Sequence, residues 1–568
     1  MPQPKTSAQQ GWLITRDGGA PAAAPGTRPA DAAETPAPGE LAPQAAGPSG
    51  RGPVTRLRSW GARVAGAWPL LAVLAVQAAL SVRLLHADTA FQDEAAYLWA
   101  GHLQWTHWLH GTSIPPFPYY FSGAPVVYPP LGALADGIGG LAAARALSLL
   151  FMLGATGLAW GTTARLFGRR PAFFAAALFA VLGPTLHLGA FATYDAMALF
   201  LLALATWLVV RAGERQDATG WMIGAGAALA LANATAYSSA LFDPVVLLIA
   251  VVTAIPRPGG KMAAARAVTV LAIAAVILTP GLLLGGSRYW HGIMVTTLQR
   301  ASGHDSPLTV ISHFWSWTGI IVVTALCGAV IAWVSQLGRP RAWLLTLLTV
   351  AALLVPAEQA SLYTTASLNK HGAMGAWFAA IAAGYAVDRL IATSPAGTMR
   401  IVTSGACVVA LCLPVTLGAS QSRMFATSWP DSSAFVAILR PLADNSTGRM
   451  LVEDPSIAEY YLASGSQWQR WSSTRNIVLP SGAPTGGPST KAGVVGAGNA
   501  GTFAMYIRIG YFSLIALNFA DTTALDESIV ADIRRNRHYH AIQVVPYGVG
   551  PVGPAPGKYV IWQYEPQK

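Results

Sequence analysis

The chain has 568 residues, of which 53% are hydrophobic and only 11% are charged. A soluble globular protein usually carries about 25% charged residues, so this composition is too apolar for a water-facing surface of this size. The net charge of +11 would suggest a nucleic-acid partner for a soluble protein. Apolar stretches long enough to cross a bilayer recur along the chain, however, so we predict a polytopic membrane protein without a nucleic-acid partner.

The N-terminal segment, residues 1–66, is rich in Pro, Ala and Gly. Such a segment cannot bury enough apolar surface to fold, so we predict a disordered tail. The first span is expected over residues 67–85. Basic residues precede it at Arg56, Arg58 and Arg63, and an excess of Lys and Arg marks the cytoplasmic side of a membrane protein. The N-terminus is therefore expected in the cytoplasm.

The remaining spans follow by parity from that orientation. About eleven spans, the last near residues 401–418, place two or three basic residues in every predicted inner loop. These are Arg165, Arg169 and Arg170, then Arg211 and Arg215, then Arg257, Lys261 and Arg266, then Arg339 and Arg341, and finally Arg389 and Arg400. We therefore expect a helical domain over residues 67–419 in the plasma (inner) membrane.

The C-terminal segment, residues 420–568, has a different character. Strand-like runs at Arg449–Glu453 and Tyr559–Tyr564 alternate with helix-like runs at Ala434–Leu442 and Ala524–Arg535. Gly and Pro separate these runs. With the last span leading outward, we predict a small α/β domain on the extracytoplasmic side.

A possible dinucleotide fingerprint lies in this segment. The glycines of Gly496-Ala-Gly498-Asn-Ala-Gly501 have the G-x-G-x-x-G spacing, and Asp521 follows. We reject this interpretation because no convincing buried strand precedes the motif. The motif also lies in a Gly/Pro/Ser stretch on the predicted extracytoplasmic side.

The first predicted outer loop begins with carboxylates. Asp88, Asp93 and Glu94 follow the first span directly, and acidic residues at a membrane boundary are costly to desolvate and often mark function. A carboxylate there could accept a proton from an acceptor hydroxyl or help to hold a divalent cation. The alternative is a solvated helix start, because Asp and Glu favour the first turn of a helix.

Further titratable residues fall in the other predicted outer loops. They are Asp195, Asp243, His304, Asp305, Glu358, Lys370 and His371. Each alone is more typical of an ordinary surface residue than of a catalyst. By parity, however, all lie on one side, where a cavity would combine carboxylates for acid–base or metal chemistry with cations for an anionic phosphate.

Aromatic residues are concentrated in the same first outer loop. They include Trp105, Trp108, Phe117, Tyr119, Tyr120 and Phe121. An interfacial aromatic belt is the default interpretation. The alternative is that these rings stack on a sugar or cover a lipid tail.

The order of these features resembles the GT-C glycosyltransferases, in the branch of protein O-mannosyltransferases and aminoarabinose transferases. The resemblance begins with the pair Asp93-Glu94, followed by Tyr97. Further similar stretches are Tyr128-Pro-Pro130, Ala144-Arg-Ala-Leu-Ser148, Leu166-Phe-Gly-Arg-Arg170, Ala190-Phe-Ala-Thr-Tyr-Asp195, Leu241-Phe-Asp-Pro244 and Ser367-Leu-Asn-Lys-His371. It is best over residues 68–250 and thinner to residue 390.

This resemblance implies a GT-C-like transmembrane domain. It also implies an enzyme that takes a sugar of mannose or pentose type from a polyprenyl-phosphate carrier. The acceptor, outside the cytoplasm, would be a protein, a glycan or a lipid. Asp93 is implied as the catalytic base, Glu94 as its support or a metal ligand, and Asp195 as a second catalytic carboxylate.

The donor and metal contacts implied by the resemblance are less complete. Tyr97, Arg145, Lys370 and His371 are implied as contacts to the substrate or its phosphate. A divalent cation stays open as a cofactor, with Glu94, His304 and Asp305 as candidate ligands. The chain departs from the pattern at Tyr237, where a basic residue is expected.

Two other functional classes also stay open. A transporter would place polar residues in broken helices at mid-membrane and often shows internal repeats, whereas the acidic residues here fall at helix ends. A non-catalytic membrane sensor or scaffold would use the C-terminal domain to bind a ligand, but it leaves Asp93 and Glu94 without a role.

Overall fold

The computed structural model describes residues 53–566 except 256–258, 301, 336–337, 464, 475, 478–495, 498–499, 521 and 549–556. Side chains are also left undescribed at 53–66, 288, 465–466, 476–477 and 496–497. Most of the predicted tail therefore lies outside the described residues, although the first helix already begins at Pro53. Part of the rejected glycine fingerprint, with Gly498 and Asp521, also lies outside them.

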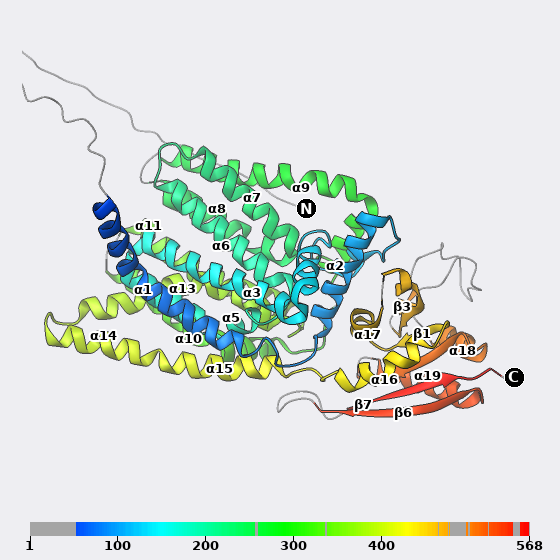
Figure 1. Cartoon of the computed structure of the whole chain (residues 1–568). Coiled ribbons are helices and arrows are strands. Elements are labelled where there is room, and N and C mark those ends of the chain that lie inside the picture. Colours follow the sequence, from blue (N-terminus) through cyan, green and yellow to red (C-terminus); the bar gives the residue numbers. More distant parts are fainter. Residues whose placement is uncertain are drawn as a thin grey trace, which may run out of the picture. The chain divides into compact units, whose positions relative to one another are not determined.

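Helices dominate the chain up to residue 426 (Figure 1). In order they are α1 (Pro53–Val82), α2 (Gln92–His110), α3 (Tyr128–Phe167), α4 (Arg169–Ala180), α5 (Gly183–Leu188), α6 (Tyr194–Gly213), α7 (Thr219–Thr235), α8 (Asp243–Ala254), α9 (Gly260–Thr296), α10 (Pro307–Val334), α11 (Arg339–Ala351), α12 (Leu354–Ser361), α13 (Leu368–Thr393), α14 (Thr398–Ala410) and α15 (Cys412–Ala426). Short 3-10 helices η1 (Phe117–Tyr119) and η2 (Tyr237–Phe242) precede α3 and α8.

Seven helical segments in the described part of the chain are long and apolar enough to cross a membrane. They are Tyr128–Phe167, Tyr194–Gly213, Tyr237–Ala254, Gly260–Ser287, Pro307–Val334, Arg339–Ser361 and Thr398–Ala426, and Ala67–Val82 is a shorter apolar helix. The chain is thus a helical multi-pass membrane protein, as its composition predicts. The number of eleven spans stays a prediction.

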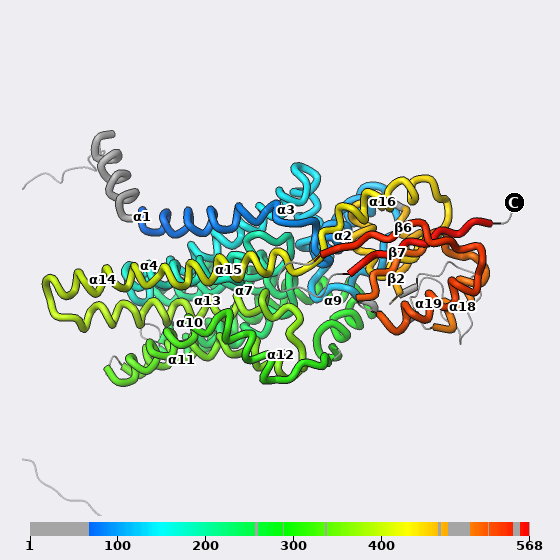
Figure 2. Tube along the Cα trace, turned by 90° about the horizontal axis from the view of Figure 1, so that it is seen from below, coloured from blue at the N-terminus to red at the C-terminus, as the bar shows by residue number. Residues whose placement is uncertain are grey.

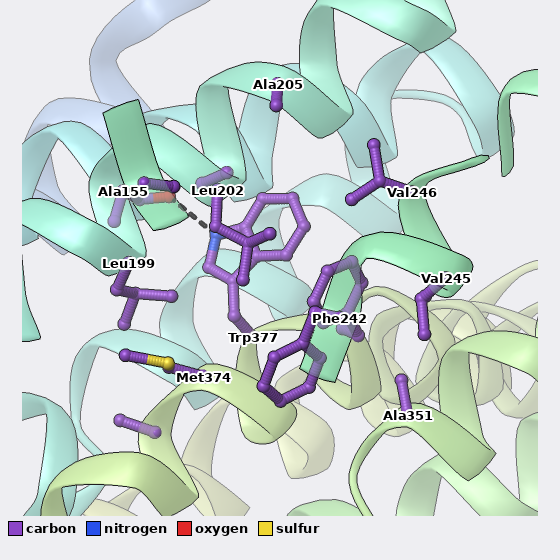
Figure 3. Close-up of a cluster of buried hydrophobic side chains, with 14 of the residues drawn as sticks. Ala155, Leu199, Leu202, Ala205, Phe242, Val245, Val246, Ala351, Met374 and Trp377 are labelled. Carbon is purple, nitrogen blue, oxygen red and sulfur yellow. Dashed lines mark hydrogen bonds between the residues drawn. The ribbon is translucent and has the colours of Figure 1, made fainter. Parts of the chain in front are cut away.

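Helix α13 forms the centre of the helical part. It packs against α10, α4 and α11, and Trp377 in its middle is fully buried. The Trp377 indole N–H donates to the Ala155 carbonyl of α3 at 2.9 Å (Figure 3). The neighbouring Phe378 stacks on Phe242, with ring centroids 5.5 Å apart. These contacts fix α13, whose first turn carries Lys370 and His371.

The two ends of the helices carry different residues. Asp195 lies in the first turn of α6 and Arg211 in its last turn, which separates them by about 24 Å along the helix. Arg165 and Arg211 both donate to the carboxylate of Glu214, at 2.7 and 3.1 Å. Arg266 donates to three backbone carbonyls between residues 212 and 216. Basic residues of three predicted inner loops therefore meet at one end, away from Asp195.

A five-stranded sheet lies in the chain after residue 426, with strand order β2-β1-β5-β7-β6. The elements of this region are α16 (Ser433–Asp444), β1 (Arg449–Val452), α17 (Pro455–Leu462), η3 (Gly465–Arg470), β2 (Trp471–Ser473), α18 (Ala500–Arg508), β5 (Phe512–Leu517), α19 (Thr523–Arg535), β6 (Tyr539–Tyr547) and β7 (Gly557–Tyr564). Two short strands, β3 (Asn476–Ile477) and β4 (Gly496–Ala497), pair separately. Strands β2, β1 and β5 are parallel, whereas β7 is antiparallel to both β5 and β6. Strands β6 and β7 lie side by side in Figure 2.

The sheet is covered on both faces because its strands alternate in the direction of their side chains. Met450 and Val452 pack with α16 and α17 on one face. Leu451 packs with α18 and α19 on the other. The four runs predicted from the sequence fall on α16, β1, α19 and β7, so the small C-terminal α/β region is confirmed.

Candidate active site

The adjacent carboxylates Asp93 and Glu94 have different surroundings. Both lie in the first turn of α2, but Glu94 is completely buried. Its Oε1 atom accepts from Arg145 Nε at 2.8 Å and from the Ala192 amide at 2.7 Å. Its Oε2 atom accepts from Arg145 Nη2 at 2.7 Å and from the Phe91 amide at 3.0 Å. A carboxylate has about four lone-pair sites, so Glu94 has none left for a substrate or a metal ion.

All N–H donors of the Arg145 guanidinium are likewise used in hydrogen bonds within the protein. Besides its two bonds to Glu94, it donates to the carbonyls of Leu85, Asp88 and Thr89 at 2.9, 3.1 and 3.2 Å. A guanidinium has five N–H donors, and all five are directed at protein oxygens. These contacts leave Arg145 no free donor for a phosphate and Glu94 no free lone pair for a metal ion, so the geometry does not favour the roles implied for them, which stay predictions. The pair instead holds the loop between α1 and α2 against α3.

Asp93 belongs to a second group of charged side chains. Lys370 Nζ lies 2.5 Å from Asp93 Oδ2 and 3.7 Å from Asp195 Oδ2. His371 Nε2 lies 3.5 Å from Asp195 Oδ1. Asp195 is fully buried, whereas the Asp93 side chain is 32% exposed. The structure thus brings together four of the predicted site residues, from α2, α6 and α13, and leaves Asp93 as the accessible carboxylate.

Tyr97 lies one helical turn after Asp93, on the same side of α2. Its ring packs against that of Tyr194, with centroids 4.5 Å apart, and meets Phe121 edge-on at 5.0 Å. Tyr194 directly precedes Asp195 in α6. The two tyrosines therefore connect the first turns of α2 and α6 beside the charged group.

A cavity of about 310 Å³ opens next to Asp93. It lies between α2 with the loop that follows it and the segment from Glu453 to Ser473. Its walls are formed by Gln92, Asp93, Ala96, Tyr97, Trp99, Pro115, Phe117, Tyr120, Phe121, Glu453, Asp454, Pro455, Ser456, Glu459, Trp468, Trp471 and Ser473. Carboxylates and aromatic rings predominate, and the described lining residues include no Lys, Arg or His.

The cavity wall formed by residues 453–473, here called the outer wall, carries three acidic residues, Glu453, Asp454 and Glu459. Glu459 is buried, with 7% of the residue exposed. Burial, together with the nearby charge of Asp454, raises the pKa of the Glu459 carboxyl well above its usual value. The group therefore keeps its proton under conditions in which an exposed glutamate is ionised.

Several predicted residues lie apart from Asp93. Asp243 Oδ2 accepts from Asn233 Nδ2 at 2.7 Å. Asp305 Oδ2 accepts from both the amide and the hydroxyl of Thr365 at 2.7 Å, and the neighbouring His304 is exposed. These residues form separate local contacts, and no contact joins them to the group around Lys370 in the described residues.

The described residues do not fit a metal site. They contain no group of three or more His, Cys, Asp or Glu that could hold a metal ion. The predicted candidates Glu94, His304 and Asp305 do not form such a group either. Between Asp93 and Asp195, the position that a bridging cation would take is filled by the Lys370 ammonium.

Comparisons with known proteins concern the fold and part of the helical domain. The profile of the family described as dolichyl-phosphate-mannose-protein mannosyltransferase matches residues 134–283. ArnT from Cupriavidus metallidurans, solved with undecaprenyl phosphate bound, superposes with a TM-score of 0.56 at 16% identity, covering 88% of this chain and 100% of ArnT. Sequence comparison with curated proteins gives no match.

A second solved structure with this fold is an archaeal enzyme. AglB, the oligosaccharyltransferase of Archaeoglobus fulgidus, was solved in complex with an inhibitory peptide and a dolichol-phosphate. It superposes with a TM-score of 0.52 at 12% identity, covering 88% of this chain and 74% of AglB. The chain therefore shares the fold of these two solved enzymes, and part of its helical domain matches the mannosyltransferase profile. The resemblance read from the sequence is thereby confirmed.

Sequence reasoning missed part of the cavity beside Asp93. Four residues of the cavity, Asp454, Glu459, Trp468 and Trp471, lie 361 to 378 residues after Asp93 in the chain, and no pattern in the sequence connects them with α2. The available signal was weak. It consists of a Glu453-Asp-Pro455 helix start and two tryptophans at 468 and 471 within an otherwise polar stretch.

Proposed function

We propose that this glycosyltransferase moves a sugar of mannose or pentose type from a polyprenyl-phosphate carrier to an acceptor hydroxyl, with Asp93 as general base. The observation that carries the proposal is the position of Asp93, which belongs to the charged group and also lines the cavity. Its Oδ2 atom pairs with Lys370, and Oδ1 has no hydrogen-bond partner among the described residues. That oxygen is available to accept a proton.

The carrier is proposed by analogy with the two solved relatives. ArnT was solved with undecaprenyl phosphate and AglB with a dolichol-phosphate. Both ligands are long-chain isoprenoid phosphates that sit in a membrane. A multi-pass protein whose charged group lies at the ends of its helices can meet such a carrier at the bilayer surface.

The proposed reaction is a displacement at the anomeric carbon of the sugar. The acceptor oxygen forms a bond to that carbon while the bond from the carbon to the carrier phosphate oxygen breaks. The acceptor proton passes to Asp93, and the carrier phosphate leaves with the bonding electron pair. Tyr97, packed between Tyr194 and Phe121, restricts where the reacting atoms can lie, which favours an aligned encounter.

Lys370 and His371 are proposed to stabilise the departing phosphate. An ammonium has three N–H donors, so Lys370 can keep its contact with Asp93 and still meet an incoming anion. His371, 3.5 Å from Asp195, supplies a second donor. Fixed cations facing a leaving group lower the barrier because their orientation is set before the charge develops.

We further propose that the charged group and the α/β domain of residues 420–568 face the extracytoplasmic side of the plasma (inner) membrane. The N-terminal tail of residues 1–66 would lie in the cytoplasm, and residues 67–419 would form the catalytic transmembrane domain. The basic residues gathered around Glu214 support this orientation, because Lys and Arg concentrate on the cytoplasmic side.

The test is sugar transfer by the purified full chain. A panel of radiolabelled polyprenyl-phosphate mannose and pentose donors is offered together with an acceptor-rich membrane extract. Wild-type protein should transfer label from at least one donor, and Asp93→Asn should reduce the rate by roughly 10²–10⁴-fold. Asp444→Asn, which changes an exposed aspartate in α16, is the matched control and should retain the wild-type rate. Folded protein that transfers from no donor would contradict the proposal.

A further inference from the structure

The two walls of the cavity are held together by specific contacts. Tyr460 Oη donates to Asp136 Oδ1 at 2.7 Å, and the Ala90 amide donates to Tyr461 Oη at 2.9 Å. The Trp468 indole N–H donates to the Ser113 carbonyl at 2.9 Å. These contacts join α17 and η3 to the segments on either side of α2. Specific hydrogen bonds therefore fix the two walls of the cavity, with Asp93 on one wall and Glu459 on the other.

The carboxyl group of Glu459 has no hydrogen-bond or ion-pair partner among the described residues, although only 7% of the residue is exposed. A buried polar group without a partner normally costs stability, so its retention points to a ligand that completes it. Burial and the nearby charge of Asp454 raise the pKa of this carboxyl, which favours its protonated form. It then offers one O–H donor and one carbonyl acceptor, which matches a pair of sugar hydroxyls.

The charge of the cavity argues against the carrier phosphate as its occupant. Four carboxyl groups line it, from Asp93, Glu453, Asp454 and Glu459, and no basic side chain does so among the described lining residues. The Glu453 carboxylate itself accepts from the backbone amides of Asn518, Phe519, Ala520 and Thr522. The lining therefore offers no cation to an anionic ligand, and the cavity suits an uncharged, hydroxyl-rich acceptor.

The aromatic walls favour a sugar over a peptide. Trp468 and Trp471 stand on the outer wall, and Trp99, Phe117 and Tyr120 on the wall of α2. Flat aromatic faces pack well against the C–H face of a sugar ring, and a few convergent polar groups then fix its orientation. The edge strand β2 contributes Trp471 and Ser473 to the cavity, and all three of its residues are buried, so the cavity offers no exposed strand edge with which a peptide could pair.

We propose that this cavity binds the acceptor and that the acceptor is an uncharged carbohydrate, with Glu459 hydrogen-bonded to its hydroxyls and Trp468 packed against a ring. This inference rests on the proposed function, since it identifies the acceptor of the same reaction. It places the acceptor hydroxyl beside Asp93, which receives its proton. Glu459 acts here as a residue that determines specificity.

The first experiment measures binding to the resting enzyme and needs no donor. Neutral di- to tetrasaccharides of mannose and arabinose are titrated against the purified full chain by saturation-transfer NMR. Wild-type protein should bind at least one of them. Glu459→Leu should weaken binding about tenfold, the value of one lost hydrogen bond of typical strength. Glu459→Gln keeps a donor and an acceptor at the same place and should stay within about threefold of wild type.

Matched controls separate this effect from loss of folding. Glu527→Gln changes an exposed glutamate of α19, and Trp315→Ala changes an exposed tryptophan of α10. Both should bind saccharide like the wild type, whereas Trp468→Ala should bind it about tenfold more weakly. Thermal unfolding of each variant checks that the protein is folded.

The second experiment measures transfer with an active donor. Glu459→Leu should raise the KM for the saccharide about tenfold and leave kcat within about threefold, because a contact made equally in the ground and transition states changes KM alone. Absence of saccharide binding, unchanged binding by Glu459→Leu, or transfer to a Ser/Thr peptide or a lipid in place of every saccharide would overturn the inference. Saccharide binding without turnover of any donor would instead contradict the proposed function and leave the cavity assignment standing.

Discussion

Asp93 and Glu94 are neighbours in the chain with the same chemical group, yet they lie in two different environments. Glu94 is buried, and every lone pair on its carboxylate has a protein donor. Asp93 is partly exposed, uses one oxygen for Lys370 and faces a cavity. The difference teaches that the sequence motif Asp-Glu contains one structural and one chemically available acid. The two acids differ in how many of their carboxylate lone pairs accept hydrogen bonds from the protein. Residue type and position along the chain do not reveal this difference.

The largest expected effect on stability comes from breaking the buried pair. Arg145→Met removes the partner of Glu94 and leaves an uncompensated carboxylate in the interior. Removal of one member of a buried ion pair typically costs about 3–5 kcal/mol. Thermal unfolding in detergent should therefore show a large drop in Tm. An unchanged Tm would mean that the Glu94–Arg145 pair does not hold the loop between α1 and α2.

Lys370→Met tests the second environment and should affect both activity and stability. The buried Asp195 carboxylate would lose the ammonium at 3.7 Å, and Asp93 would lose its ion pair. We expect transfer to fall by at least about 10²-fold, since charge stabilisation of the leaving group is also lost. We also expect a lower Tm.

A double variant separates these two contributions of Lys370. Lys370→Met combined with Asp195→Asn removes the uncompensated charge, so its Tm should exceed that of Lys370→Met alone while transfer stays low. A double variant no more stable than Lys370→Met would show that Asp195 does not depend on this ammonium.

Much of this comparison could be predicted from the sequence. The alternation of predicted spans and the basic residues of the inner loops predict one side of the membrane for Asp93, Asp195, Lys370 and His371. In the structure these four side chains lie within contact distance of one another as one group. The roles of Glu94 and Arg145 could not be predicted, because saturation depends on the carbonyls of Leu85, Asp88 and Thr89, which carry no side-chain signal. Glu459 and Trp468 were missed because they are far from Asp93 in the chain. They come near it only because α17 and η3 pack against α2 in the folded protein.

A smaller effect is expected from Asp88, in the loop that Arg145 holds. Burial raises the pKa of Asp88 to about 6, above the value of an unfolded chain, so the folded state binds more protons between about pH 4 and pH 6. Stability should therefore fall as pH rises through this window and level off above it. Asp88→Asn should remove this fall, which amounts to about 1 kcal/mol because the half-buried group is partly screened by solvent. Tm measured across pH 4 to 8 checks the sign.

The smallest expected effect concerns the contact between α17 and α3. Tyr460→Phe removes the hydroxyl that donates to Asp136, while His102 Nε2 remains 2.7 Å from the other oxygen of that carboxylate. Loss of one hydrogen bond should lower the free energy of unfolding by about 1 kcal/mol. Transfer should remain near the wild-type rate in a thermal and kinetic comparison. A large loss of transfer would mean that this contact sets the position of the cavity wall.

The most direct test of the central claim compares Asp93→Asn with Glu94→Gln in one assay of transfer and thermal unfolding. Both changes replace a carboxylate by its amide at adjacent positions. Asp93→Asn should lose transfer by roughly 10²–10⁴-fold and keep a Tm close to the wild type. Glu94→Gln should lower Tm strongly, because it removes the charge that pairs with Arg145. The fraction that stays folded should still transfer sugar. If Asp93→Asn retains transfer, or if folded Glu94→Gln loses it as completely, then the assignment of chemistry to Asp93 and of structure to Glu94 is contradicted.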